Sequence, residues 1–365
     1  MSEKINTEDI TIVVQGAIHP QFTPLCLESI AKYLPKSKVI LSTWKNEESK
    51  VEKMLEEGKL FNQVIFNDDP GMSGYRVRFD VQIDKKIPDN TNRQIVSTIN
   101  GLKAVETKYA MKLRSDFVLT GVGFLKYFDK FKKRIEDPQL LLFNKRILIM
   151  GYTTEICNIP FWINDLFSFG TTKDMIKLWD IKLMDDDCIN YYFKHGFVNK
   201  ENGILSGIGL PHRYFAEPYI FINCVSKNIP NIFEIFRDYT DATDKNRILS
   251  EKLIANNFVA LETKLLNVEP LKENLLIVKT YKFYCKWQEI YKKYCDETYN
   301  IPFRFSNLIG KINQKDIKKF NKYLKKLIQP IEDLFNFVVS PFLIFFYLFK
   351  LLIKIIKVIY HDYKQ

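Results

Sequence analysis

Four short apolar runs in the first third of the chain each end in a polar cluster. They are Ile10–Gly16, Lys38–Trp44, Gln63–Asp69 and Tyr109–Asp116. Each has the length of a buried strand. Stretches with helical spacing lie between them, at Pro24–Tyr33, Glu47–Glu57 and Arg93–Val105. Because strands alternate with helices, the pattern predicts an α/β fold with a mostly parallel sheet and helices on both faces.

The second half of the chain continues this alternation less regularly. Strands are expected at Arg146–Met150 and Trp162–Ser168, and either a strand or a helix over Ile254–Val268. Helices are expected through Met175–Trp179, Asp185–Lys194 and Glu217–Ser226. Residues 71–89 break the pattern, and we expect a flap over the site there, with a strand near Arg76–Ile83. The predicted organisation is a main domain at 1–268, an aromatic-rich connection at 269–314 with no assigned element, and a tail at 315–365.

Composition is typical of a globular protein of the cytosol. The 365 residues suffice for one large domain or two small ones, and Met1–Asp9 lacks the apolar segment of a signal peptide. The six cysteines include no CxxC pair, which indicates reduced thiols rather than a disulfide framework or a zinc site. The four histidines share no metal-ligand spacing. Asp185–Asp187 is best explained as the acidic start of a helix, where the helix dipole favours negative charge.

The net charge of +11 is concentrated in the last part of the chain. Residues 311–365 hold 11 lysines, no arginine and four acidic residues. Ile317, Phe320, Leu324 and Leu327 recur at helical spacing among the lysines, which predicts a basic amphipathic helix. The lack of arginine and the wealth of apolar residues favour an anionic membrane surface over nucleic acid as the partner.

A second stretch of the tail is apolar on all sides. Leu334–Phe349 carries no charge over 16 residues, which is short of the ~20 that a spanning helix needs. We therefore predict that residues 315–365 lie in the plane of the membrane as a peripheral, monotopic anchor. The competing interpretation is a helix that is buried in the protein or forms a dimer.

Polar residues stand at the end of each of the four apolar runs. They are Gln15 and Gly16, then Thr43, then Asp68 and Asp69, and finally Arg114 and Asp116. Ligands of parallel sheets bind just beyond the carboxyl ends of the strands, so these residues form a candidate site. Asn67–Gly71 also fits a simple turn, and Asp116 also fits a residue that caps a turn.

The amino-acid sequences of several segments resemble those of a known family. ITIVVQG, KVILSTW, VIFNDDPG, NTNRQIVSTINGLKAVETKYAMKLRSDFVLTG and DLFSFGTTKDMIKLW are similar to the WavE family of lipopolysaccharide-synthesis proteins, over roughly Ile10–Ile222. The resemblance implies a glycosyltransferase of the inverting GT-A type on a nucleotide-binding sheet. It would move a sugar from a nucleotide-sugar donor to a lipid-linked or polysaccharide acceptor in lipopolysaccharide or capsule synthesis, at the cytoplasmic face of the inner membrane.

The resemblance also assigns roles on the donor side. Gln15 and Gly16 would receive base and ribose, because glycine lets the backbone approach a ligand; Thr43, Asp68 and Asp69 would add hydrogen bonds. GT-A enzymes usually carry Asp-x-Asp after the fourth strand, whereas this chain has Arg114-Ser115-Asp116. Asp116 alone would hold Mg²⁺ or Mn²⁺ with the diphosphate. Alternatively, Arg93, Lys112 and Arg114 would replace the metal as fixed cations.

An inverting transferase also needs a carboxylate that takes the proton of the acceptor. Asp165 and Glu217 are the candidates, with a slight preference for Glu217. Each also has a structural explanation, since an acid before Pro218 suits a helix start. Asp116 is expected at a strand end outside the core, so that its removal would leave the fold intact.

Two other functions remain open from the sequence. A sugar nucleotidyltransferase is built on a related sheet, but the glycine-rich phosphate loop that follows its first strand is missing here. A non-catalytic membrane-bound assembly factor with a degenerate nucleotide fold is compatible with the incomplete Asp-x-Asp. Turnover of a nucleotide sugar would separate the enzyme from this factor.

Overall fold

The computed structural model describes residues 5–58, 61–78, 86–151, 159–195, 208–209, 211–272 and 283–301. The chain forms two compact units, Met1–Ile301 and Pro302–Gln365. The second unit, and with it the predicted membrane tail of residues 315–365, lies outside the described residues. The architecture below is therefore that of the first unit.

A mixed, mostly parallel sheet organises this unit. Within the described residues it has seven strands, in the order β11 (Phe258–Leu261), β8 (Ile147–Met150), β9 (Phe167–Thr171), β6 (Tyr109–Arg114), β1 (Ile10–Gln15), β2 (Lys38–Trp44) and β3 (Gln63–Asn67). β9 alone among them runs antiparallel to its neighbours β6 and β8. The α/β class and the mostly parallel sheet predicted from the alternation are thus confirmed.

One predicted strand begins later than expected. The sequence pattern places it at Trp162–Ser168, whereas β9 begins at Phe167. The side chain of Asn164 accepts a hydrogen bond of 2.8 Å from the backbone N–H of Leu166, which makes a local turn in place of a ladder. Just before the predicted strand, Phe161 has a φ of 60°, so the backbone enters this segment from a turn rather than from an extended conformation.

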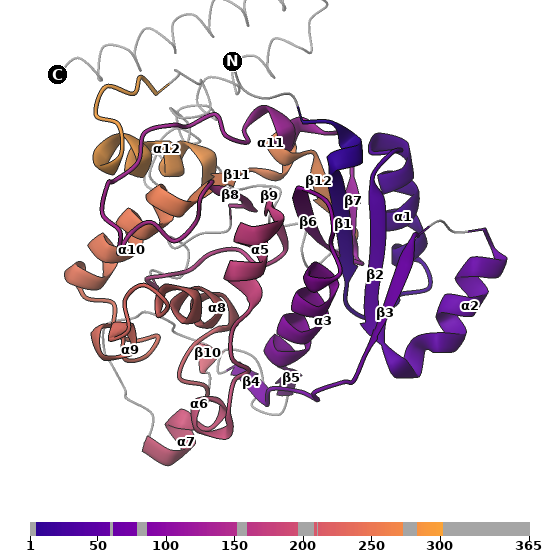
Figure 1. The fold of residues 1–365 in the computed structure, drawn as a ribbon. Coiled ribbons are helices and arrows are strands. Elements are labelled where there is room, and N and C mark those ends of the chain that lie inside the picture. Colours follow the sequence, from indigo (N-terminus) through magenta and orange to yellow (C-terminus); the bar gives the residue numbers. More distant parts are fainter. Residues whose placement is uncertain are drawn as a thin grey trace, which may run out of the picture. The chain divides into compact units, whose positions relative to one another are not determined.

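Helices cover both faces of the sheet. They are α1 (Phe22–Tyr33), α2 (Glu48–Glu56), α3 (Thr91–Lys103), α5 (Thr172–Trp179), α6 (Asp186–Ile189), α7 (Tyr191–His195), α8 (Ala216–Val225), α9 (Ile232–Ile235), α10 (Asp244–Asn257), α11 (Thr263–Leu266) and α12 (Phe283–Tyr294). The chain moves from β1 through α1 to β2, then returns from β3 through α3 to β6. Because crossovers between parallel strands are right-handed, these opposite directions put α1 and α3 on opposite faces (Figure 1).

Helix α3 lies unusually close to the sheet because its contact point is a glycine. A Cβ at Gly101 would stand 2.4 Å from Cγ1 of Val13 on β1 and 3.1 Å from Cβ of Ser42 on β2. Glycine costs helix stability, so its presence here is explained by the close approach rather than by helix propensity. Beside α3, α5 packs against β6 and β9, and α8 packs on α5 (Figure 1).

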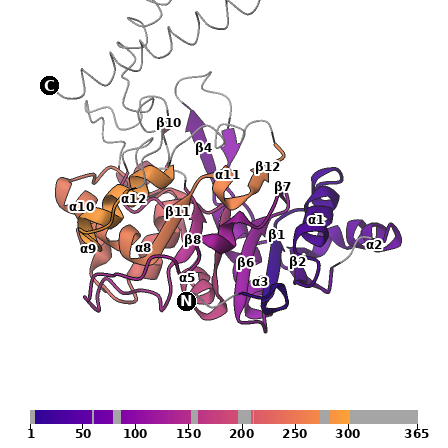
Figure 2. The ribbon, with the colours of Figure 1, turned by 90° about the horizontal axis from the view of Figure 1, so that it is seen from above.

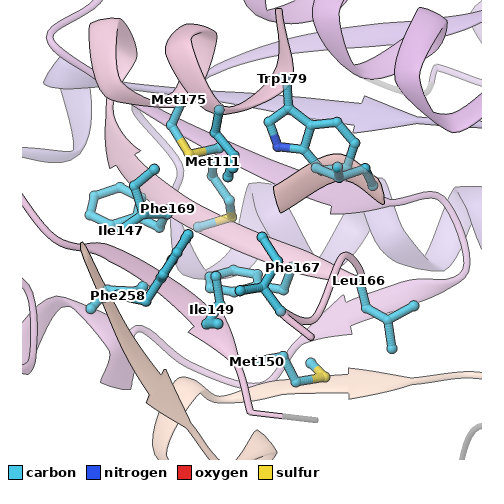
Figure 3. Packing of buried hydrophobic residues seen from close by; sticks show 14 of the residues in the cluster. Met111, Ile147, Ile149, Met150, Leu166, Phe167, Phe169, Met175, Trp179 and Phe258 are labelled. Carbon is cyan, nitrogen blue, oxygen red and sulfur yellow. The ribbon is translucent and has the colours of Figure 1, made fainter. Parts of the chain in front are cut away.

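The core is densest where β6, β8 and β9 meet. Figure 3 shows Met111, Ile147 and Phe169 from these three strands close together, with Met175 of α5 above them. The ring of Phe169 lies 4.9 Å from that of Phe124, between centroids, in an edge-to-face arrangement. Packing of this kind fixes the strand positions and hence the polar residues at the strand ends.

Two smaller sheets flank the large one. β4 (Tyr75–Arg78) pairs with β5 (Lys86–Pro88) and with β10 (Ile208–Gly209), all antiparallel. Figure 1 shows these strands beyond the end of β3, near the start of α3. The expected flap strand at Arg76–Ile83 corresponds in part to β4, and residues 79–85 lie outside the described residues. The other small sheet pairs β7 (Phe117–Leu119) with β12 (Val268–Pro270).

Several elements of the second half differ in detail from expectation. The helix expected at Asp185–Lys194 is divided into α6 and α7, and Asp185 caps α6 by accepting from the N–H of Cys188 at 2.8 Å. The expected single element over Ile254–Val268 contains the end of α10, β11 and α11. Part of the unassigned connection forms α12, which packs on α10 and β11 (Figure 2).

Candidate functional site

The point where the strand order reverses lies between β1 and β6. From β1 the chain extends the sheet towards β3, and it then crosses back to place β6 on the other side of β1. In open α/β sheets, ligands bind outside the carboxyl ends of the strands at this kind of point. Gln15 ends β1 directly opposite Arg114, which ends β6. The sequence-predicted residues of these two strand ends are thus neighbours.

The backbone at the end of β1 is shaped for close approach. Gly16 has a φ of 110°, a conformation that other residues rarely adopt, and its N–H donates to the carbonyl of Ser42 at 3.1 Å. The amide oxygen of Gln15 accepts from the hydroxyl of Ser97 on α3 at 2.8 Å. The Ser115 hydroxyl donates to the carbonyl of Ala17 at 2.7 Å. These bonds tie the end of β1 to α3, and the loop after it to β2 and to the end of β6.

Asp116 is a buried carboxylate at the centre of a partly exposed ion cluster. Its two carboxylate oxygens accept from Nε and Nη2 of Arg114 at 2.9 and 2.7 Å, and Nζ of Lys272 lies 2.8 Å from one of them. Only 3% of Asp116 is exposed, so the expectation that it lies outside the core is wrong. Burial acts to raise its pKa, but hydrogen bonds and charge from both cations outweigh burial and hold the pKa at about 2.

Lys272 is a member of this cluster that the sequence did not reveal. It follows β12, whose residue Pro270 pairs with Phe117, the residue after Asp116. The N–H of Leu271 donates to the backbone carbonyl of Asp116 at 2.9 Å. The pairing joins residues about 150 positions apart, and no local pattern in the chain signals it.

Lys112 does not face the strand ends. It is completely buried, its ammonium contacts the backbone carbonyl of Asp165, and it lies 4.9 Å from the ring centroid of Trp179. Burial lowers its pKa to about 7, although the carboxylate of Asp165 acts in the opposite direction. The position of Lys112 therefore does not favour contact with a diphosphate. Lys112 instead holds the backbone of Asp165 in place.

Asp165 reaches the site because β9 is antiparallel. The beginning of β9, rather than its end, lies at the edge where β1 and β6 end. The backbone carbonyl of Asp165 also accepts a hydrogen bond from the side-chain amide of Gln94 on α3, at 3.2 Å. Burial acts to lower the pKa of Arg114. The carboxylate of Asp116 and, less strongly, that of the half-buried Asp165 act to raise it, and the net result is a raised pKa. Asp165 is thus electrostatically coupled to the cluster.

Arg93 forms a bidentate ion pair with Asp69. Its Nε and Nη2 donate to the two oxygens of Asp69 at 2.7 and 2.6 Å, and Nη1 donates to Asn90 at 2.9 Å. About a third of each side chain is exposed, at 31% and 32%. Asp68 instead points to solvent, 86% exposed, and pairs with Lys45. The structure therefore joins Arg93 to Asp69 and leaves Asp68 apart.

Thr43 is buried and serves a different partner. Its hydroxyl donates to Oε2 of Glu47 at 2.5 Å, and the same oxygen accepts from the N–H of Ile18 at 2.9 Å. Glu47 is itself 6% exposed, and Lys50 pairs with its other oxygen at 2.8 Å. Thr43 thus fixes the loop after β1 through Glu47, which in the sequence resembles an ordinary charged residue at a helix start.

Glu217 lies in the first turn of α8 and is half-buried. Helix α8 packs against α5 and α9, and Phe215, which precedes it, has its ring 5.1 Å from that of Trp162, between centroids. The two candidate bases are therefore not equivalent in position. Asp165 stands at the edge that carries Arg114 and Asp116, whereas Glu217 stands at the start of a helix whose other residues are all buried.

The donor set around Asp116 does not fit a divalent cation. Both carboxylate oxygens are engaged by cationic side chains, Arg114 and Lys272, which would repel a metal ion. In the part of the chain that the structure describes, no group of three His, Cys, Asp or Glu side chains is arranged to hold a metal. The sequence-based expectation of Mg²⁺ or Mn²⁺ at Asp116 thus has no support from the geometry.

A cavity of about 540 Å³ lies at the opposite edge of the sheet. Its lining includes Lys108, which precedes β6, and Thr171, which ends β9. Arg114 and Asp116 stand at the other end of β6, so this cavity is separate from the candidate site.

The fold is that of an α/β protein with a mostly parallel sheet, and its candidate ligand site is the charged cluster at the carboxyl edge of that sheet. The chain matches the family model described as WavE lipopolysaccharide synthesis over residues 10–321, and it belongs to that family. A comparison with curated proteins gave no match. Within the described residues, no helix is long and apolar enough to cross a membrane.

Among solved structures, one that matches is 4-diphosphocytidyl-2C-methyl-D-erythritolsynthase from Anaerococcus prevotii DSM 20548. The sequences are 12% identical, and the match covers 51% of this chain and 82% of that one, with a TM-score of 0.29. Similarity at this level bears on neither the site nor the function.

Proposed function

We propose that this protein is a GT-A-type glycosyltransferase that moves a sugar from a nucleotide-sugar donor to a lipid-linked or polysaccharide acceptor in lipopolysaccharide or capsule synthesis. The observation that carries the proposal is the charged cluster at the β1–β6 boundary of a protein from a lipopolysaccharide-synthesis family. Positive side chains beyond parallel strands suit a diphosphate, whose departure a transferase must stabilise.

The base and ribose of the donor are assigned to the end of β1. There Gly16 leaves backbone accessible, while Gln15 and the Glu47-bound loop are held in place by hydrogen bonds. Arg93, at the start of α3, presents a guanidinium that Asp69 orients from the side. A helix start with an arginine favours a phosphate or a sugar carboxylate nearby.

Asp165 is the better candidate for the base that deprotonates the acceptor. Lys112 and Gln94 fix its backbone, and its carboxylate is half-buried and close enough to Arg114 to influence its pKa. A base must lie within reach of the reacting centre, and Asp165 stands at the same sheet edge as the phosphate-binding groups. This reverses the slight preference for Glu217 drawn from the sequence.

The function is tested by incubating the full chain with a panel of nucleotide sugars and lipid-linked acceptors. The expected result is transfer or hydrolysis of one donor, which mass spectrometry detects. A chain that binds no nucleotide sugar in a thermal-shift screen and turns over none would contradict the proposal and would favour the non-catalytic assembly factor.

The choice of base gives a second prediction. Asp165→Asn is expected to lower turnover by about 100-fold or more while donor affinity stays within about twofold, because general-base catalysis typically contributes ~10²–10⁴-fold. Glu217→Gln is the matched carboxylate-to-amide control and should retain most activity. The two are compared by steady-state rates and by calorimetry with the donor. Loss of turnover in Glu217→Gln alone would transfer the role to that residue.

The C-terminal tail supplies a third prediction, which rests on the sequence. Removing residues 315–365 should release the protein from membranes and leave donor binding unchanged. Lysines at an anionic surface contribute ~1 kcal/mol each and are screened by salt, whereas burial of the apolar stretch is not. Flotation with anionic vesicles should therefore show partial release by salt and complete release by detergent. Complete release by salt alone would argue against insertion of the apolar stretch.

A further inference from the structure

We infer that Arg114 and Lys272, both held by Asp116, bind the diphosphate of the donor in the place that a divalent cation occupies in a metal-dependent transferase. This inference rests on the proposed function and assigns Lys272 to the site. It also changes the role of Asp116, which orients two cations and does not touch a metal.

The first observation is the division of the donors on Arg114. Two of its nitrogens, Nε and Nη2, hold the Asp116 carboxylate, which fixes the plane of the guanidinium. Among the described residues no acceptor is bound to Nη1, and 29% of the side chain is exposed. Arg114 therefore keeps a donor for a ligand while its orientation is already set.

The second observation is the place of Lys272. Its ammonium is 2.8 Å from Asp116, and 41% of the side chain is exposed. An ammonium carries three N–H donors, and one of them satisfies Asp116. Because β12 is paired to β7, the backbone that carries Lys272 is fixed at the end of β6 as well. Two cations from distant parts of the chain thus meet at one carboxylate.

The net charge of the group has the sign that attracts a diphosphate. Two fixed cations and one carboxylate leave one net positive charge at an edge that Gln15 and Gly16 share. The carboxylate stays ionised over the working range, since its pKa is held at about 2. The cations are consequently oriented before the ligand arrives, and preorganised charge is the main way in which proteins stabilise a leaving group.

Calorimetry with nucleoside diphosphates tests the inference on the full chain. UDP, GDP, CDP and ADP are titrated in EDTA and again in excess Mg²⁺. We expect one of them to bind with affinities that agree within about twofold in the two buffers, because a buried carboxylate already paired with two cations leaves no vacant ligand for the metal. Lys272→Met should weaken that binding by about tenfold, whereas Lys272→Arg should retain most of it.

Lys36→Met is the matched control, because Lys36 makes an ion pair of the same length, 2.8 Å, with Glu8 at the surface. Thermal unfolding of each variant checks that the fold persists. Binding that requires Mg²⁺, or equal affinity in Lys272→Met, would overturn the inference while leaving the transferase proposal in place. Failure of all four diphosphates to bind would overturn both.

Discussion

Asp116→Asn is expected to lower sugar transfer by about 100- to 1,000-fold. The amide keeps the size of the side chain but removes the charge that Arg114 and Lys272 share at 2.7 and 2.8 Å. Without that charge the two cations repel each other and lose their common orientation, and loss of one preorganised donor to a transition state already costs ~10²–10³-fold. Initial rates at saturating donor measure the effect.

The same substitution should also weaken the fold. Asp116 is 5% exposed at its side chain and links the end of β6 to the segment after β12. Breaking a fully buried ion pair by removing one partner costs about 3–5 kcal/mol. The cost here is expected to be smaller, because Arg114 and Lys272 are 29% and 41% exposed, and denaturant unfolding measures it. Asp68→Asn is the control, because Asp68 pairs with Lys45 at 2.7 Å but is 86% exposed. Near-normal rates in a folded Asp116→Asn protein would contradict the site assignment.

Lys112→Met is expected to change the pH dependence of stability by several kcal/mol. The wild-type pKa of Lys112 is about 7 in the folded chain, below its usual 10.5. Between these values the unfolded chain binds more protons, so the free energy of unfolding rises with pH; below about 7 both states are protonated and this contribution is lost. Each pKa unit corresponds to about 1.4 kcal/mol. The methionine variant should lack the rise.

Urea unfolding at a series of pH values measures how the free energy of unfolding depends on pH in the wild type, in Lys112→Met and in a control variant. Lys38→Met is the control, because Lys38 is 54% exposed and pairs with Glu106 at the surface. Its pH curve should run parallel to that of the wild type. A wild-type curve that is flat relative to Lys112→Met above pH 7 would show that the buried amine remains fully protonated and is compensated by its neighbours.

The first half of the fold was accessible from local pattern. Each of the four apolar runs became a strand, and the helical stretch expected at Arg93–Val105 corresponds to α3, whose buried residues include Ile95, Ile99 and Leu102. Such runs are bounded by turns and alternate with helices, so their spacing and their order along the chain are enough to predict a mostly parallel sheet. The family was also predicted from the sequences of these segments, and the match to the family model confirms it.

The strand ends were identified from the sequence, but their environments were not. Periodicity places Lys112 and Asp116 on a strand that approaches the site, yet it cannot state which residues cover them. Trp179 and Asp165 bury the first, and Lys272 closes over the second. Each of these covering residues comes from a segment more than 45 positions away. Burial by such residues decides whether a charged group contacts a ligand or another part of the protein.

The sequence by itself determined the α/β class, the family and the polar strand ends, because each depends on residues that are close along the chain. The tertiary structure alone decided that β9 runs antiparallel and brings Asp165 to the site, and that β12 returns Lys272 to Asp116. Strand direction and long-range pairing are selected by how whole faces pack together. No local pattern encodes that choice, so the chemistry of the site became visible only once the sheet had been assembled.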